Sequence, residues 1–95
     1  MDKKVEISIL LEIYGKLLTE KQNEYMNYYY NEDLSLSEIA ENEGITRQAV
    51  MRILQKSSKK LEEYEQKLQI MEKQKQIKKF IESNELDKIE NLLNI

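Results

Sequence analysis

The segment from residue 34 to residue 61 contains the local signals that most constrain how this chain folds. Ser35 and Glu38 have the spacing of a capping box, which starts a helix. Gly44 fits the position just past a helix end, where a left-handed backbone costs glycine little. Thr46 then fits the cap of a second helix. We therefore predict two helices joined by a tight turn, the first over residues 36–43 and the second beginning at residue 47.

Small and apolar residues around this turn have the spacing of a helix-turn-helix. Ala40 is small where the helices would cross, and Gly44 follows four residues later. Ile45 and Val50 are apolar at positions that would point back into a core. An ordinary helical hairpin with no DNA role is the alternative interpretation.

The distribution of charge favours the DNA-binding interpretation, although the net charge of the chain is −3. Residues 46–60 hold five basic residues and no acid, whereas residues 31–45 hold five acids and no base. A solvated helix surface is the alternative, and it is weakened because every charge on the second helix has one sign. The basic charge is therefore concentrated on the helix that would read DNA.

The face of the second helix opposite Val50 presents Gln48, Arg52, Gln55 and Lys59 when the helix is projected at about 100° per residue. Arginine favours guanine edges and glutamine favours adenine edges in the major groove. Side chains at the flanks of this face are better placed for phosphates, which position a protein without reading sequence. We predict that duplex DNA is contacted by Thr46, Arg47, Gln48, Met51, Arg52, Gln55, Lys56 and Lys59.

Two further helices are predicted before this motif. Apolar residues recur at three- and four-residue spacing over residues 4–18, and Thr19 with Gln22 forms a capping box for a helix over residues 20–31. The first stretch superficially resembles a signal peptide, but Glu6 and Glu12 interrupt it. We interpret it as an amphipathic helix of a cytoplasmic protein, in which Gly15 marks close packing.

Three consecutive tyrosines, residues 28–30, occur near the end of the second predicted helix. They could form a stacking platform for single-stranded nucleic acid. Consecutive helical positions point about 100° apart, however, so the three rings cannot share one flat surface. We therefore prefer a packing role, with rings inward and hydroxyls in water.

The chain beyond residue 61 carries both signs of charge and has no Pro or Gly. We predict one long helix over residues 47–82, then a break at residues 83–84 and a short helix over residues 85–93. A domain boundary is predicted between residues 1–60, with the helix-turn-helix core at 35–57, and an extension at 61–95. The long helix has two apolar stripes, which suggests one contact with the N-terminal core and one with a second subunit. The predicted homodimer contacts are Leu61, Tyr64, Leu68, Met71, Ile77, Phe80 and Ile81.

Composition excludes several classes of function. The absence of Cys and His makes a structural zinc site and histidine-based acid–base chemistry untenable. No apolar run approaches the roughly 20 residues that span a bilayer, so we expect no membrane insertion. No group of catalytic residue types converges, and we expect no enzyme activity, no cofactor and no small-molecule substrate. Long unbranched side chains dominate, and they favour an all-α fold.

Two resemblances extend this interpretation. The segments Leu34-Ser35-Leu36-Ser37-Glu38-Ile39-Ala40 and Gly44-Ile45-Thr46-Arg47 resemble domain 4 of bacterial sigma factors. A closer similarity, over roughly residues 7–71, is to the YlxM-type helix-turn-helix proteins. It is carried by Tyr14-Gly15-Lys16-Leu17-Leu18-Thr19-Glu20-Lys21-Gln22, Thr46-Arg47-Gln48-Ala49-Val50 and Leu61-Glu62-Glu63-Tyr64-Glu65-Gln66-Lys67-Leu68.

The second resemblance implies a stand-alone sigma-4-like module. Together with the helices predicted from the residues, it gives an all-α, sigma-4-like helix-turn-helix bundle with a long C-terminal helix continuing from the recognition helix. It also implies a gene beside those of the signal recognition particle, and a regulatory role inferred from that neighbourhood. The chain departs from the family pattern at Met51-Arg52-Ile53-Leu54, where Arg52 makes the helix more basic.

Two functions follow as hypotheses. The first is a dimeric regulator that reads duplex DNA with the helix-turn-helix. The second is a non-enzymatic adaptor that docks protein or RNA, for example components of the signal recognition particle, through its acidic face and long helix.

Overall fold

The computed structural model describes residues 2–93, and within that range every regular element is a helix. This confirms the predicted all-α class, and it agrees with a composition rich in residues that lose little side-chain freedom in helices. The elements are α1 (Lys3–Tyr14), the 3₁₀ turn η1 (Gly15–Leu17), α2 (Glu20–Tyr30), α3 (Leu36–Glu43), α4 (Arg47–Leu68), α5 (Ile70–Glu82) and α6 (Leu86–Leu92).

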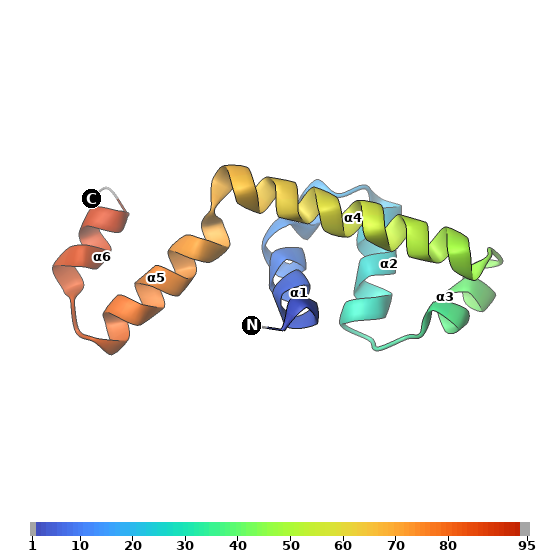
Figure 1. Ribbon diagram of the computed structural model, residues 1–95, viewed down its shortest axis with the longest axis horizontal. Helices are drawn as coiled ribbons and strands as arrows, with labels where there is room; N and C mark the ends of the chain where they lie inside the picture. The colour runs from blue at the N-terminus through green and yellow to red at the C-terminus, as the bar shows by residue number, and fades with distance from the viewer. Residues whose placement is uncertain (1, 94–95) are drawn as a thin grey trace.

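Helix α4 is the element against which the N-terminal half of the chain packs. It lies across α1, α2 and α3, as Figure 1 shows, and it contacts all three. Its inner face is the one predicted from periodicity, with Val50, Leu54 and Leu61 buried. Ser57 is also fully buried there, and its hydroxyl donates to the carbonyl of Ile53 at 2.7 Å, so the burial leaves no polar group unsatisfied.

Both predicted capping boxes are present. Thr19 Oγ1 accepts from the amide of Gln22 at 3.1 Å, and the Gln22 side chain accepts from the amide of Thr19 at 3.1 Å. Ser35 and Glu38 exchange the same two bonds at 3.1 and 3.0 Å. These bonds satisfy amide groups that the first turn of a helix leaves free, which is why α2 and α3 begin where the sequence indicates.

The first helix is shorter than predicted, because it tightens into a 3₁₀ turn after Tyr14. Gly15 is buried at this point, and its carbonyl accepts from Nδ2 of Asn23 at 2.9 Å. A Cβ on Gly15 would lie 2.7 Å from the same nitrogen. A larger residue would therefore displace the Asn23 side chain and its hydrogen bond, which agrees with the predicted role of Gly15 at a close packing contact.

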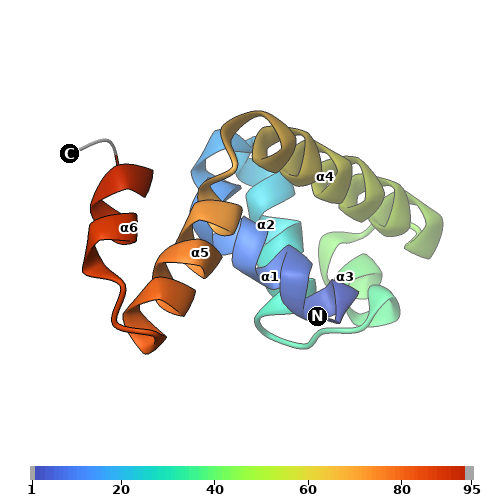
Figure 2. The ribbon, with the colours of Figure 1, turned by 60° about the vertical axis from the view of Figure 1, so that its left-hand side comes forward.

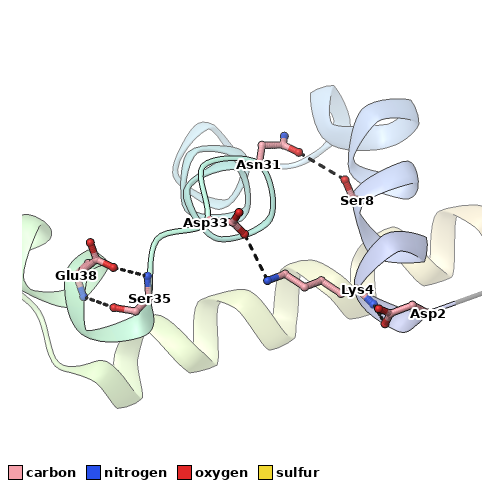
Figure 3. Close-up of polar contacts among 7 residues, drawn as sticks. All are labelled: Asp2, Lys4, Ser8, Asn31, Asp33, Ser35 and Glu38. Carbon is pink, nitrogen blue, oxygen red and sulfur yellow. Dashed lines mark hydrogen bonds and ion pairs between the residues drawn. The ribbon is translucent and has the colours of Figure 1, made fainter.

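Exposed polar contacts join the start of α1 to the connection between α2 and α3 (Figure 3). Nζ of Lys4 lies 3.7 Å from the carboxylate of Asp33, and the hydroxyl of Ser8 donates to the side chain of Asn31 at 3.5 Å. Exposed pairs of this kind contribute at most about 1 kcal/mol each. They fix the direction of the connection that leads into the Ser35 cap rather than adding much stability.

The prediction of one helix over residues 47–82 is wrong. The helix ends at Leu68, and Gln69 takes a left-handed backbone with φ of 55° and ψ of 33°. A non-glycine residue in that conformation costs roughly 1 kcal/mol, so other contacts must hold the break in place. We call this bend between α4 and α5 the elbow.

The carboxylate of Glu65 holds the elbow. It accepts from the amide of Met71 at 2.9 Å, the amide of Glu72 at 3.0 Å and the hydroxyl of Tyr14 at 2.7 Å. The Tyr14 hydroxyl in turn accepts from the amide of Ile70 at 3.1 Å. Glu65 of α4 and Tyr14 of α1 thus accept from the three amides at the start of α5. In a continuous helix these amides would instead bond to carbonyls of the preceding turn.

These contacts shift the ionisation of both side chains at the elbow. Partial burial acts to raise the pKa of the Glu65 carboxyl, but the hydrogen bonds from Tyr14, Met71 and Glu72 outweigh it, and the pKa is lowered. Burial, and then the hydrogen bond to Glu65, raises the pKa of the Tyr14 hydroxyl. The ionised carboxylate and the neutral phenol are therefore the forms that the fold stabilises.

Beyond the elbow, the chain leaves the core. Met71 still packs in the core, so the core extends past residue 60, and α5 contacts α1, where Gln74, Lys75 and Lys78 line a gap beside Ile9. Helix α6 stands away from the N-terminal helices (Figures 1 and 2). The molecule measures 53 × 22 × 16 Å, with a radius of gyration of 16.4 Å. A compact chain of this length would have a radius of about 12 Å. Residues 94–95 of the predicted extension lie outside the described residues.

Candidate nucleic-acid interface

The turn between α3 and α4 has the geometry predicted for a helix-turn-helix. Gly44 has a φ of 68°, and its amide and that of Ile45 both reach the carbonyl of Ala40. Thr46 caps α4 by accepting from the amide of Ala49 at 3.0 Å. The first turn of α4 contains Arg47 and no acid. The partial positive charge that the helix dipole places at the N-terminus of α4 is therefore available to an anion.

All eight residues predicted to contact DNA are exposed. Gln48, Arg52, Gln55 and Lys59 lie opposite the buried face of α4, and we call these four residues the reading face. They extend over about 16 Å of helix, at about 1.5 Å per residue. The flanking side chain of Met51 is 43% exposed. The structure therefore places one continuous polar and basic surface along the first three turns of α4.

The basic residues of α4 have no acidic partner. Within residues 2–93, the ion pairs use Lys3, Lys4 and Lys88, none of which belongs to α4. Acids begin one turn after Lys59, where Glu62 pairs with Lys3 at 3.2 Å. The positive charge of the reading face is thus free for an external anion, and it ends where α4 passes over α1.

A groove lies beside the reading face, between α2, α3 and α4. It has a volume of about 520 Å³. Tyr29 and Tyr30 form its α2 wall in an edge-to-face pair with ring centroids 4.9 Å apart. Perpendicular rings cannot form a flat stacking surface, so the packing role predicted for the tyrosines is confirmed. The full lining is Tyr29, Tyr30, Leu36, Met51, Leu54, Gln55, Ser58, Lys59 and Glu62.

A second groove, of about 430 Å³, lies between α2 and the end of α3 and is mainly acidic. Its lining is Glu20, Lys21, Glu24, Tyr25, Glu43 and Ile45. The Tyr28 hydroxyl donates to Glu24 at 2.6 Å, and this bond raises the pKa of Tyr28 to about 12. The three glutamates of the groove would repel phosphates. A nucleic acid on the reading face would therefore extend in a direction that avoids this groove.

The residues predicted for a homodimer do not form one surface. Leu61 and Met71 are 0% and 6% exposed and belong to the core of a single chain. Tyr64 is half-buried against Tyr14, with ring centroids 6.0 Å apart. Leu68 and Ile81 are exposed, whereas Ile77 and Phe80 are half-buried in the C-terminal helices. These residues were predicted from their heptad spacing. Such spacing occurs when a helix packs against its own chain and also when it packs against another subunit, so it does not distinguish the two.

No signal in the sequence predicted the Tyr14–Glu65 pair. Glu65 occurs in a run of charged residues with no feature that separates it from its neighbours. Its role depends on a tyrosine 51 positions earlier in the chain. Local spacing carries no signal for such a contact.

The tight turn, the capped second helix and the packing of α4 on three helices define this chain as a helix-turn-helix protein. No helix within residues 2–93 is long and apolar enough to cross a membrane. The chain belongs to the UPF0122 family, whose model, described as "Putative helix-turn-helix protein, YlxM / p13 like", matches residues 1–93. The resemblance to YlxM-type proteins is thereby confirmed.

Similar proteins occur in several bacteria. A UPF0122 protein of Clostridium kluyveri is 44% identical over 98% of this chain and 96% of its own length. One from Fusobacterium nucleatum is 43% identical, covering 98% of each chain. One from Shouchella clausii is 49% identical over 77% of this chain and 67% of its own length. The first two similarities include the elbow and the C-terminal helices as well as the helix-turn-helix.

Proposed function

We propose that this protein binds duplex DNA by placing the reading face of α4 in the major groove. The observation that carries the proposal is the free positive charge of that face, which is exposed and unpaired in the structure. A major groove about 12 Å wide admits an α-helix. The opposite side of α4 is buried, so the fold holds the reading face rigidly outward.

Three side chains of the reading face suit base edges, and two residues at its flanks suit phosphates. Arg52 would bind a guanine edge, and Gln48 and Gln55 would bind adenine edges. Arg47 and Lys56, at the flanks, would bind phosphates, with the capped end of α4 adding its dipole. The acidic groove on the far side of α2 would keep the DNA in one orientation.

A regulatory role as a homodimer is the finer part of this proposal. Helix-turn-helix proteins commonly read paired half-sites with two copies. The resemblance to YlxM-type proteins implies that the regulated process is linked to the signal recognition particle. The division into a DNA-binding part before residue 60 and a pairing part after it belongs to the same proposal.

Fluorescence anisotropy with labelled random duplexes at two salt concentrations tests DNA binding. Neutralised phosphates release counterions, so affinity should fall steeply with salt, with a log–log slope of about −0.9 per phosphate contact. Replacing Arg52 and Lys59 together by Ala should weaken binding and make the slope shallower. The matched control is Lys16→Ala with Lys67→Ala, which removes the same charge from exposed positions outside the reading face.

Two results would contradict this proposal. One is the absence of duplex binding at low salt by a protein whose circular dichroism shows the helical fold. The other is an equal loss of affinity in the control pair and in the Arg52 and Lys59 pair. The second result would show that binding follows bulk charge and not the reading face.

The acidic groove supports an adaptor as the second candidate function. Three carboxylates line it around the ring of Tyr25, a combination that suits a basic and aromatic protein partner. Purified components of the signal recognition particle, mixed with the protein without DNA, test this alternative. Binding that Glu24→Lys with Glu43→Lys abolishes, and that Arg52→Ala leaves unchanged, would favour the adaptor.

A further inference from the structure

The two C-terminal helices form a hairpin with apolar side chains in contact with water. We call residues 70–93, which contain α5 and α6, the arm. Ile81 and Leu86, on either side of the bend, are 63% and 67% exposed, and Leu93 is 47% exposed. Ile77, Phe80, Ile89 and Leu92 are only half-buried. None of these residues belongs to the core cluster beneath α4.

The arm contains a helix that is too short to be stable without more cover. Helix α6 has seven residues, and isolated helices shorter than about 12–15 residues are marginal in water. Its main neighbour is α5. The bend between them leaves a gap of about 100 Å³ that is open to solvent and lined by Phe80, Ile81, Asn84, Glu85, Leu86 and Ile89. A second apolar surface would cover the side of α6 that α5 leaves in contact with water.

The charges of the arm indicate what that surface is. Helix α5 carries four lysines and two glutamates, a net charge of +2. Residues 83–93 carry three acids and one lysine, a net charge of −2. Within residues 70–93, the only ion pair joins Lys88 to Glu85 at 3.2 Å, so no lysine of α5 forms an ion pair. Among these lysines, Lys75 lies near enough to Glu65 to help lower the pKa of that carboxyl. Each half of the arm thus complements the other half of a second arm.

We propose that a second copy of this chain covers the arm, with α5 of each copy packed against α6 of the other in a four-helix bundle. Such a contact is isologous, because the same surface serves both copies. Two helical hairpins that bury their apolar stripes together form a bundle of the usual kind. Compared with the homodimer contacts predicted from the sequence, this contact adds Leu86, Ile89 and Leu93. It leaves out Leu61 and Met71, which are buried in the core of a single chain.

The balance of charge favours a second copy over a lipid surface. Interfacial helices bind anionic lipids through an excess of basic residues, whereas the charges of the arm sum to zero. The arm also lies at the opposite end of the molecule from the turn between α3 and α4 (Figure 1). Pairing through the arm therefore leaves both reading faces free. It rests on the homodimer of the proposed function and specifies its contact, but it does not depend on the proposed DNA binding.

Light scattering of the purified full chain at micromolar concentration tests the pairing. The expected mass is twice the monomer mass of 11.4 kDa. Ile81→Glu and Leu86→Glu should each reduce the measured mass by half, because they replace the most exposed apolar side chains of the contact by a charge. The matched control Leu17→Glu changes an apolar side chain of η1 that is 53% exposed and should leave the mass unchanged. A monomeric wild-type protein, or a control that dissociates while the arm variants do not, would overturn the proposal.

Charge exchange tests the arrangement of the helices. The first variant, Lys73→Glu with Lys79→Glu, makes α5 acidic, and the second, Asp87→Lys with Glu90→Lys, makes α6 basic. Each variant alone should be monomeric because like charges face each other, whereas an equal mixture should form a heterodimer of doubled mass. If each variant pairs with itself as strongly as the wild type, the α5-to-α6 arrangement is refuted. Anisotropy with duplex DNA, measured on the same samples, separates a failure of pairing from a failure of DNA binding.

Discussion

Removing the Glu65 carboxylate should destabilise the protein by about 2 kcal/mol. Glu65→Ala deletes the acceptor for the amides of Met71 and Glu72 and for the Tyr14 hydroxyl. Hydrogen bonds to a charged group contribute roughly 1.5–3 kcal/mol each, and losing a helix cap costs about 0.5–2 kcal/mol. These figures are not summed, because the cap and its hydrogen bonds are the same contacts and because water replaces much of what is lost at a partly buried carboxylate. A loss of about 2 kcal/mol is the value of one such bond or one full cap.

Urea unfolding followed by circular dichroism measures this loss, and a double-mutant cycle with Tyr14→Phe isolates the contact between the two side chains. Tyr14→Phe keeps the buried ring and removes only the hydroxyl, so the cycle should give a coupling of about 1 kcal/mol. The control Glu63→Ala removes a neighbouring exposed glutamate and should change stability by less than about 0.5 kcal/mol. A loss for Glu65→Ala no larger than the control's, or additive effects in the cycle, would refute the assignment of the elbow to this carboxylate.

Three further predictions concern the core, the elbow and pH. Leu61→Ala should cost about 2–5 kcal/mol of unfolding free energy and Leu68→Ala less than about 1 kcal/mol in urea titrations, because only Leu61 is buried; equal losses would contradict the core assignment. Gln69→Gly should raise the free energy of unfolding by up to about 1 kcal/mol, since glycine adopts the left-handed backbone without strain; a loss of stability would show that the bend is not strained. The stability advantage of the wild type over Glu65→Gln should be full above the ordinary Glu65 pKa of 4.5 and should fall as acid protonates the folded protein in unfolding titrations, because the folded-state pKa is lowered and the ionised carboxylate is the form that adds stability. An advantage that grows as the pH falls would refute the direction of the shift.

The helix boundaries that the sequence predicted correctly depend on short-range chemistry. Ser35 and Glu38 lie three positions apart, and Gly44 needs only its own backbone freedom, so these signals can be read without a fold. The break at Gln69 could not be read in this way. It is imposed by a carboxylate and a phenol that meet only after α1 has packed on α4, and local propensity alone favours a continuous helix.

The same distinction applies to the candidate site. Helical periodicity was sufficient to predict that Gln48, Arg52, Gln55 and Lys59 are exposed, because the direction of a side chain on a helix follows from its position. Periodicity could not decide whether Leu61 and Met71 face their own chain or another one. An apolar stripe indicates that one side of a helix is buried. Only the packed structure shows that Leu61 and Met71 are buried against their own chain.

The two sides of helix α4 are under different constraints, one from packing and the other from the proposed binding. Its inner side chains hold three other helices together, while its reading face makes no contact on which the fold depends. Substitutions at positions 48, 52, 55 and 59 are therefore nearly neutral for stability, and drift among relatives could change the preferred target while the scaffold persists. The same property makes these four positions a natural set to randomise in a library, because most of its members would still fold.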